Sequence, residues 1–505
     1  MMNKLFLRSL LGGPARIRPA ACALGAALAL AGCAAGPDYV VPAQAVGESY
    51  KEIQGWKPAN PGDTGLRTDW WVAFNDPELD RLMRRMLASN LGIVQAEAQY
   101  RQAQALLRSA RSAFFPTVGV SSSVTRSGGG SGNTGGQTGQ SGGGTSNQYS
   151  LSGNVSWEAD LWGRVRRSVE SNDASARASA ADLANTRLSM QSTLAQSYFQ
   201  LRSLDAEKSL YQQTLQAYER SLRMTQNRYD AGISAQADVA AARAQLENAR
   251  AQMLALDWQR AQYEHAIAVL LGLPPSAFSL KDAPLATDVP DIPVALPSQL
   301  LERRPDVAAA ERRTAAANAQ IGVATAAWFP DLTLSAQGGY RSGEWAQWLT
   351  APFRFWSLGP ALALTVFDGG ARQAQVEQAR AAYDAQVASY RLTVLTALRE
   401  VEDYLVQLRV LDEEQQAQGR ALEAARESLQ LTQNQYDAGL IDYLSVAQVE
   451  ATALSTERAA LSLRTSRLVA SVQLITALGG GWHVGDPVVG LAGEPAAGTQ
   501  PPAVQ

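Results

Sequence analysis

Four short stretches of the chain alternate apolar and polar residues with a period of two. The clearest runs from Tyr149 to Trp157, where every second residue is apolar or glycine and the residues between are serine or asparagine. This period is typical of a β-strand with one apolar and one polar face. The pattern predicts strands at about 117–126, 149–159, 331–341 and 358–367. Strands of about ten residues are long enough to cross a bilayer at a tilt.

The two faces of these strands differ in polarity along their whole length. The polar face carries side chains suited to a water-filled lumen: Ser121, Ser123, Ser150, Ser152, Asn154, Thr333, Ser335 and Gln337. Aromatic residues gather at the strand ends, as in the girdle of an outer-membrane barrel: Phe114, Phe115, Trp157, Trp162, Trp328, Phe329 and Phe367. A β-hairpin lying on a soluble core is the alternative, but no neighbouring helical sequence has a spare apolar face to cover it.

Four strands are too few to close a barrel, because the smallest barrels have about eight strands. The chain is therefore expected to oligomerise. A symmetric ring of three chains would supply a barrel of 12 strands. The fold class expected is a mixed α and β membrane protein.

Sequence typical of long helices fills most of the remaining chain. Two stretches, at about 163–230 and 370–437, contain no proline and are rich in alanine, glutamine, glutamate, arginine and leucine. The apolar residues that match between the two stretches, such as Leu194, Leu201 and Leu215, are mostly seven residues or a multiple of seven apart, as in helices that pack along their length. At 1.5 Å per residue each helix would be on the order of 100 Å long, far beyond the usual length in globular proteins. The pattern predicts coiled coils, and by itself it does not exclude a soluble antiparallel scaffold.

The two halves of the chain are copies of one unit. A shift of 207 residues aligns about 160–272 with 367–479 without a gap. Upstream the shift is 214 residues, and the excess in the first copy falls in the Gly/Ser tract 127–147, a flexible loop by composition. Each copy reads helix, strand-bearing insert, long helix, turn and helix, so the sequence predicts an internal duplication.

The tetrapeptide Tyr-Asp-Ala-Gly occurs once in each copy, at 229–232 and at 436–439. Glycine readily adopts the left-handed conformation that ends many helices. Gly232 and Gly439 are therefore predicted to let each long helix end and reverse into its partner.

The N-terminus reads as a secretory signal for a lipoprotein. Scattered positive charge up to Arg18 precedes the apolar run 20–30, which is too short to span a bilayer as a helix. The next residues, Leu-Ala-Gly-Cys at 30–33, resemble a lipobox, so Cys33 is expected to be acylated after removal of residues 1–32. Alternatively, Cys33 is an ordinary small residue after a signal peptidase site. Ala34, in place of an aspartate, resembles lipoproteins sorted to the outer membrane.

Composition and charge exclude several classes of function. The chain has 46% hydrophobic and 18% charged residues, and loss of the four positive charges in 1–32 takes its formal charge from −3 to −7. A nucleic-acid partner is therefore not expected. Cys22 leaves with the signal, so the mature chain has one thiol and no internal disulfide. Neither His265 nor His483 lies near a cysteine or another histidine in the sequence, so no zinc site is predicted. No phosphate-binding or hydrolase motif occurs. The sequence predicts that the protein is not an enzyme and holds no metal or cofactor.

A set of motifs in order along the mature chain resembles the TolC-like outer-membrane efflux factors, specifically the lipidated, NodT/OprM-like branch that serves resistance-nodulation-division pumps. These motifs are Cys33 with Gly-Pro-Asp-Tyr at 36–39 and Pro42; Trp70-Trp71, Phe74 and Asp76-Pro77; Asp-Leu-Trp-Gly-Arg at 160–164; Leu-Glu-Arg-Arg-Pro-Asp at 301–306 with Glu311, 317–319 and 321–322; Phe-Asp-Gly-Gly at 367–370; and both Tyr-Asp-Ala-Gly turns. The resemblance covers essentially all of the mature chain.

The resemblance implies a homotrimer that forms one tube, with a 12-stranded barrel in the outer membrane and a long α-helical barrel in the periplasm. Its expected partners are a periplasmic adaptor protein, an inner-membrane resistance-nodulation-division transporter and outer-membrane lipid. The domain plan is a signal peptide at 1–32, a lipidated and equatorial N-terminal region at 33–75, repeat 1 at 76–280, an equatorial linker at 281–297, repeat 2 at 298–480, and a partly disordered equatorial tail at 481–505.

The two turns are predicted to form a closed periplasmic tip that an adaptor opens. By the resemblance, an acidic ring beside the first turn matches Asp238 and an apolar ring beside the second matches Leu444. The second acidic ring falls on Gln448, with Ser445 nearby, so this chain departs from the pattern. Asp238 is expected to favour cations in the closed pore. Alternatively, Asp238 only stabilises the first turn of the helix that follows.

Two functions remain: a passive exit duct for drugs or other small molecules, and a non-conducting envelope lipoprotein tether. The polar strand face favours the duct, because a tether needs no lumen. Among ducts, a type I secretion outlet is the main rival of the efflux channel. The lipobox and the 301–306 motif favour the efflux channel.

Overall fold

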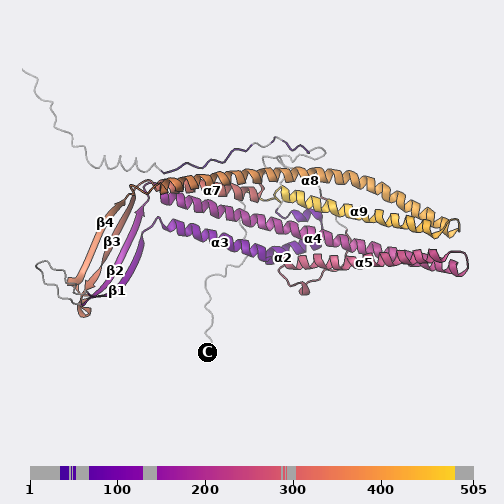
Figure 1. Ribbon diagram of the computed structural model, residues 1–505, viewed down its shortest axis with the longest axis horizontal. Coiled ribbons are helices and arrows are strands. Elements are labelled where there is room, and N and C mark those ends of the chain that lie inside the picture. The colour runs from indigo at the N-terminus through magenta and orange to yellow at the C-terminus, as the bar shows by residue number, and fades with distance from the viewer. Residues whose placement is uncertain are drawn as a thin grey trace, which may run out of the picture. The chain divides into compact units, whose positions relative to one another are not determined.

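Helices of matched length repeat along the chain, in the order that an internal duplication requires. The structure is a computed structural model that describes residues 34–44, 47, 49–52, 68–128, 145–285, 288–290, 292 and 303–483. The long helices α4 (Arg164–Asp230) and α8 (Ala371–Asp437) each have 67 residues. The helices that follow them, α5 (Gln236–Leu270) and α9 (Tyr443–Ala477), each have 35. The helices before the strands, α3 (Leu91–Ser112) and α7 (Pro305–Ala326), each have 22. Figure 1 shows this order by colour.

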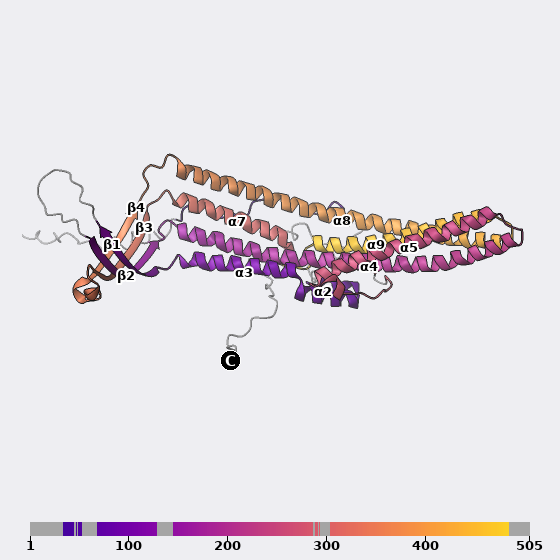
Figure 2. The same cartoon turned by 60° about the horizontal axis from the view of Figure 1, so that its bottom comes forward.

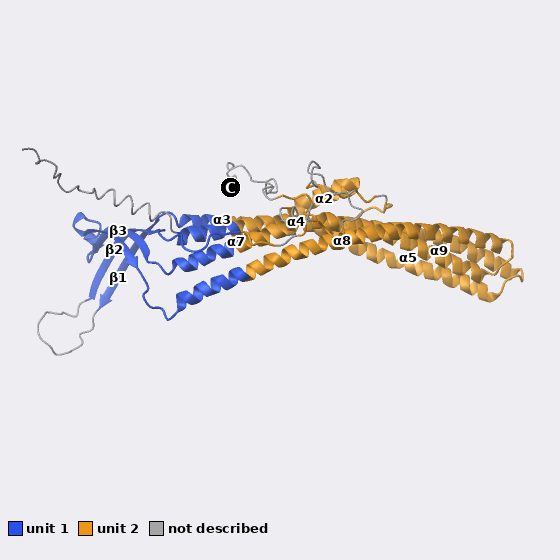
Figure 3. Cartoon of the chain, turned by 90° about the horizontal axis from the view of Figure 1, so that it is seen from above, with its two compact units in different colours: residues 1–40, 105–174, 315–384 blue, residues 41–104, 175–314, 385–505 orange. Residues whose placement is uncertain are grey.

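The chain divides into two compact units, drawn in blue and orange in Figure 3. Unit 1 comprises residues 1–40, 105–174 and 315–384, and unit 2 comprises 41–104, 175–314 and 385–505. The strands lie in unit 1. The two helix-reversing turns lie in unit 2.

Unit 1 contains one antiparallel sheet with strand order β1-β2-β3-β4. Its strands are β1 (Thr117–Gly128), β2 (Thr145–Ala159), β3 (Asp331–Ser342) and β4 (Arg354–Ala363). The short 3₁₀ helices η3 (Trp345–Gln347) and η4 (Ala351–Phe353) join β3 to β4. Because β2 pairs with β3, the two copies of the strand insert form a single sheet.

Two strand boundaries differ from the prediction. The fourth strand, expected at 358–367, lies four residues earlier, because its pairing ends where Ala363 meets Asp331 at the start of β3. Leu364 and Val366 continue the apolar alternation beyond that partner. The tract 127–147, predicted to be a flexible loop, begins and ends in strand, since Gly128 pairs with Thr145 and the hydroxyls of Ser127 and Ser146 lie 2.8 Å apart.

Local side-chain contacts fix where the helices begin. The Asp160 carboxylate accepts the amides of Val165 (3.0 Å) and Arg166 (2.9 Å) at the start of α4. Asp76 does the same for Glu78 and Leu79 at the start of α2 (Pro77–Ser89), whose first residue is proline. These are helix-capping contacts of aspartate, and proline is favoured in a first helical turn.

The core of unit 2 is built on the aromatic motif that precedes α2. Trp70 and Phe74 belong to the 3₁₀ helix η1 (Trp70–Phe74) and are buried. Phe74 packs on Phe199 of α4 at a ring-centroid distance of 5.1 Å, and the Trp70 indole donates to Gln191 at 3.0 Å. The motif therefore attaches the segment before repeat 1 to the middle of α4.

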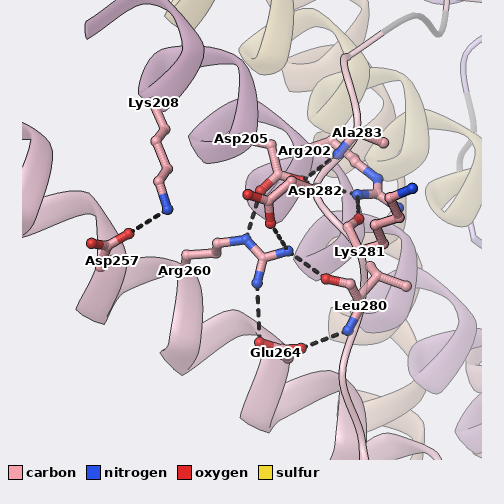
Figure 4. A network of polar contacts seen from close by, with 10 residues as sticks. All are labelled: Arg202, Asp205, Lys208, Asp257, Arg260, Glu264, Leu280, Lys281, Asp282 and Ala283. Carbon is pink, nitrogen blue, oxygen red and sulfur yellow. Dashed lines mark hydrogen bonds and ion pairs between the residues drawn. The ribbon is translucent and has the colours of Figure 1, made fainter. Parts of the chain in front are cut away.

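A charged network in unit 2 attaches the chain after repeat 1 to α4 and α5 (Figure 4). Arg260 donates to Asp205 (2.6 Å) and to the Leu280 carbonyl (2.6 Å), and it also pairs with Glu264 and Asp282. The same positions in repeat 2 form the Arg467–Asp412 pair at 2.7 Å. The duplication therefore retains this ion pair, whereas the contact with the Leu280 carbonyl lies at the end of repeat 1 and the pair with Asp282 lies in the linker. The 3₁₀ helix η2 (Pro275–Ala277) lies between α5 and this contact.

Candidate pore wall and helical turns

The sheet of unit 1 has one apolar and one polar face, as the alternation predicts. Val118, Val155, Ala336 and Leu358 are matched in register across all four strands. This apolar face remains exposed in the single chain, with 74% of Val118 and 76% of Leu358 accessible. An apolar face of this extent is costly in water and suits a lipid environment.

The opposite face carries a ladder of hydroxyl and amide groups. Ser121 and Ser152 lie 3.0 Å apart through their hydroxyls, and Ser123 and Ser150 lie 2.6 Å apart. The remaining predicted polar residues fall on the same face through the strand register: Asn154 opposite Gln337, and Thr333 and Ser335 opposite residues of β2. This face is suited to contact with water.

Each Tyr-Asp-Ala-Gly segment forms the turn that ends a long helix. Gly232 and Gly439 have φ of 74° and 75°. The Ile233 amide donates to the Arg228 carbonyl at 2.8 Å, and the Leu440 amide donates to the Gln435 carbonyl at 2.9 Å. Together with the amides of Gly232 and Gly439, which donate to the two tyrosine carbonyls, this is the Schellman arrangement. Both turns lie at the same end of unit 2 (Figures 1 and 2).

The two turns present different side chains at this end. Asp238 lies in the first turn of α5 and accepts the Ala235 amide at 3.2 Å. This contact caps the start of α5, which is the alternative to a role in the pore. Leu444 is 65% exposed, and Gln448 is exposed. Ser445 donates its hydroxyl (2.7 Å) and its amide (3.1 Å) to Asp442 at the start of α9. These hydrogen bonds lower the pKa of Asp442 and keep it ionised.

The paired tyrosines of the turns have different environments. Tyr229 is 39% exposed, whereas Tyr436 is 3% exposed. We call α4–α5 hairpin 1 and α8–α9 hairpin 2. Tyr436 of hairpin 2 packs against hairpin 1: its hydroxyl lies 2.9 Å from that of Thr225, and the Arg228 guanidinium stacks 4.2 Å from its ring centroid. Arg228 also donates to the Tyr436 carbonyl at 2.7 Å. These contacts form a joint between the hairpins beside the turns.

The sequence predictions did not include the joint residues Thr225, Arg228 and Glu450. Glu450 is 5% exposed and accepts a hydrogen bond from the Ser221 hydroxyl at 3.2 Å. Its sequence signal is an acid in the apolar seam of α9, where Tyr443, Val446 and Ala453 are also buried. For Arg228, the sequence shows only that repeat 2 has a different residue, Gln435, at the matching position.

The segment after Cys33 contacts both α4 and α7 in unit 1. Arg167 donates to the Ala35 carbonyl (3.2 Å) and to Asp38 (2.7 Å), and Asn318 donates to the Pro37 carbonyl (3.0 Å). Gly36 crosses α7 so closely that an added methyl group would collide with Gly322. We call residues 34–39 the N-terminal strap. Cys33 itself lies outside the described residues.

The described part of the chain presents no group of three His, Cys, Asp or Glu side chains placed to hold a metal ion. In the same residues no helix has both the length and the apolar character required to cross a membrane.

Comparison with known proteins identifies the relatives of this chain. A family model described as outer membrane efflux protein matches residues 82–273 and 296–480. The probable efflux pump outer membrane protein TtgC of Pseudomonas putida is 31% identical over 460 residues, which cover 90% of this chain and 94% of that protein. The pyoverdine export outer membrane protein OpmQ of Pseudomonas aeruginosa is 32% identical, over 84% of this chain and 90% of that protein. The solved structure of the outer-membrane channel OprN matches with a TM-score of 0.81 and 33% identity, covering 89% of this chain and 100% of that chain.

Proposed function

The chain belongs to the outer membrane efflux protein family, and we propose that its homotrimer is the passive exit duct of a tripartite efflux system in the outer membrane. The observation that carries this proposal is the two-faced sheet. Its exposed apolar face suits lipid, and its ladder of serine hydroxyls suits a lumen filled with water.

The trimer follows from the edges of the sheet. In one chain β1 and β4 each have one partner strand, so both leave an edge of unpaired backbone groups. Lipid offers no hydrogen bonds to such groups, so the edges must pair with other chains. Three copies of four strands give the 12-stranded barrel.

The duct supplies no free energy of its own. A periplasmic adaptor protein connects it to an inner-membrane resistance-nodulation-division transporter, and the transporter drives export. The chain acts as a channel and not as an enzyme. The polar groups described above cover one face of the sheet, cap helices or join the two hairpins. The transporter selects the cargo, which is a drug or another small molecule.

Cys33 carries the lipid that anchors the mature N-terminus. The N-terminal strap supports this assignment, because Arg167 and Asn318 hold the residues directly after Cys33 in a fixed position. Mass spectrometry of the purified protein tests it: a diacylglyceryl adduct on an N-terminal Cys33 is expected, and an unmodified mature N-terminus contradicts the assignment.

The two turns form the closed periplasmic tip and the surface on which the adaptor docks. Its proposed residues are Tyr229, Gly232, Asp238, Tyr436, Gly439, Leu444, Ser445 and Gln448. Tyr436 contributes through the joint, because it is buried between the hairpins. Asp238 has two proposed roles at this tip, the selection of cations and the capping of α5.

Single-channel recording in planar bilayers tests the duct. Discrete conductance steps are expected from the purified trimer, and a tether would give none. Deletion of the gene in its own host distinguishes an efflux channel from a type I secretion outlet. Increased sensitivity to small toxic compounds, with unchanged protein secretion, is expected for the efflux channel. The reverse result identifies a secretion outlet.

A further inference from the structure

Glu450 is a buried acid in the joint between the two hairpins. It lies on α9 and accepts a hydrogen bond from the Ser221 hydroxyl of α4 at 3.2 Å. Its second carboxyl oxygen, Oε2, is buried without a hydrogen-bond partner among the described residues. Since Oε2 is buried within one chain, a neighbouring subunit cannot reach this oxygen.

The groups that face Glu450 are polar but uncharged. Tyr218 of α4 and Tyr443 of α9 are its titratable neighbours, and Tyr436 of α8 lies behind Tyr443 at a centroid distance of 5.9 Å. The Tyr443 hydroxyl makes no hydrogen bond of ordinary geometry in the described part of the chain, but it lies close enough to Glu450 to favour the ionised form of that carboxyl. From α5, the Gln245 amide donates to the Tyr218 hydroxyl at 3.1 Å.

No cation is among the described groups that act on Glu450, and two nearby arginines pair elsewhere. Arg228 donates to the carbonyls of Tyr436 and Asp437, and Arg458 pairs with Glu207 at 2.6 Å. An ionised carboxylate that is buried without a cation is strongly disfavoured, so the packed joint holds Glu450 in its neutral form. Separation of the hairpins would bring the carboxyl into water, where it ionises.

We propose that Glu450 is a proton-binding site that controls the joint: the bound proton keeps hairpin 2 packed on hairpin 1, and its release favours their separation and the open tip. This inference rests on the proposed duct with a closed tip. The ligand is the proton alone, and the site requires neither a metal ion nor a second chain.

The direction of the pH effect follows from burial. Burial raises the pKa of Glu450 from 4.5 to about 7, and the hydroxyls of Ser221 and Tyr443 oppose this rise. Below pH 4.5 the carboxyl is neutral in both arrangements, so pH has no effect on the joint. As the pH rises from 4.5 through 7, only the separated arrangement ionises freely. The difference, 7 − 4.5 = 2.5 pKa units, shifts the balance toward separation by roughly 300-fold.

The open probability of the reconstituted trimer between pH 5 and pH 8 tests this proposal. It is expected to rise with pH in the wild type, and Glu450→Gln, which has nearly the same shape and no charge, is expected to stay closed. Glu457→Gln is the matched control, because Glu457 lies on the same helix but pairs with Arg426 across the surface. It should retain the wild-type rise.

A second variant keeps the test decisive if Glu450→Gln assembles poorly. Ser221→Ala removes a hydrogen bond that lowers the pKa of Glu450, so the midpoint of the pH response should move to higher pH. A wild-type open probability that is independent of pH overturns the proton site, as does an unchanged midpoint in Ser221→Ala. Absence of conductance at every pH, even in variants that weaken the joint, would instead contradict the proposed duct.

Discussion

At the scale of single residues, two glycines of α8 and its turn should respond in opposite ways to replacement by alanine. Gly439 follows the helix with a φ of 75°, and Gly419 lies in its interior. An added methyl group would meet no atom within 4 Å at either position, so only backbone conformation distinguishes them. We expect Gly439→Ala to destabilise the protein by about 1 kcal/mol, because a side chain is strained in the left-handed region.

Gly419→Ala is the control, and it should stabilise by about 0.5–1 kcal/mol through helix propensity. The apparent melting temperature of the purified trimer, followed by circular dichroism, should therefore fall for Gly439→Ala and rise for Gly419→Ala. A shift of the same sign in both variants would contradict the assignment of the turn.

Asp238 has two proposed roles that one substitution can separate. Asp238→Asn removes the charge but retains an oxygen that can accept the Ala235 amide. If Asp238 forms a selective ring, the reversal potential in a KCl gradient should lose part of its cation preference while the melting temperature hardly changes. Asp238→Ala should lose both. An Asp238→Asn channel with wild-type selectivity would leave helix capping as the only role.

At the scale of elements, the two faces of β1 should respond differently to charge. Val120 is 78% exposed on the apolar face, and Ser121 is the next residue, on the polar face. A lysine on the lipid-facing side of a barrel strand costs up to about 2–4 kcal/mol at the bilayer centre. Val120→Lys should therefore reduce the heat-resistant trimer in outer-membrane fractions, whereas Ser121→Lys should assemble and alter conductance. Equal loss from both variants would argue against a membrane-spanning sheet.

The joint between the hairpins should govern leakage. Arg228→Gln reproduces the residue found at the matching position of repeat 2, and it removes the stacking on Tyr436 and the charge-assisted bonds to two carbonyls. We expect this variant to admit vancomycin into cells, because a looser joint favours the open tip. Tyr436→Phe removes only the contact with Thr225, on the order of 1 kcal/mol, and should leak less. Wild-type vancomycin resistance in Arg228→Gln would exclude a role of the joint in closure.

The elements were largely predictable from the sequence because long periods and turn residues are local signals. The long helices begin and end within about one residue of the expected bounds, since glycine and aspartate mark their ends. The end of β4 was not predictable, because Ala363 is the last paired residue only through its partner in β3. The burial of Tyr436 and the exposure of Tyr229 were not predictable either, because they depend on tertiary contacts. The two turns share one sequence motif but have different neighbours.

At the scale of the whole molecule, the duplication produces one sheet and two unequal hairpins. The strands of both repeats pair directly, whereas Arg228 and Glu450 occur in only one copy of the repeat. The matching residues are Gln435 and Arg243, so the hairpins cannot exchange roles. This inequality is the basis of the proposed joint, since each hairpin supplies a different group to it.

The N-terminal strap connects the proposed lipid to both repeats, because it contacts α4 of repeat 1 and α7 of repeat 2. Arg167 is 5% exposed and contacts Ala35 and Asp38 of the strap. If the lipid stabilises the trimer through the strap, Arg167→Ala should remove most of the effect of acylation. The melting temperature of the trimer should then fall in Arg167→Ala and in Cys33→Ser, and the double variant should fall by less than the sum of the two.

Arg166→Ala is the matched control, since Arg166 lies beside Arg167 but pairs with the neighbouring Asp160 at 3.2 Å. Its effect should be small and should add to that of Cys33→Ser. If Arg167→Ala is also additive with Cys33→Ser, the lipid and the strap stabilise the trimer independently. In that case the contact between the strap and α4 serves to pack the two repeats together, and the acyl chains act only by holding the mature N-terminus at the membrane.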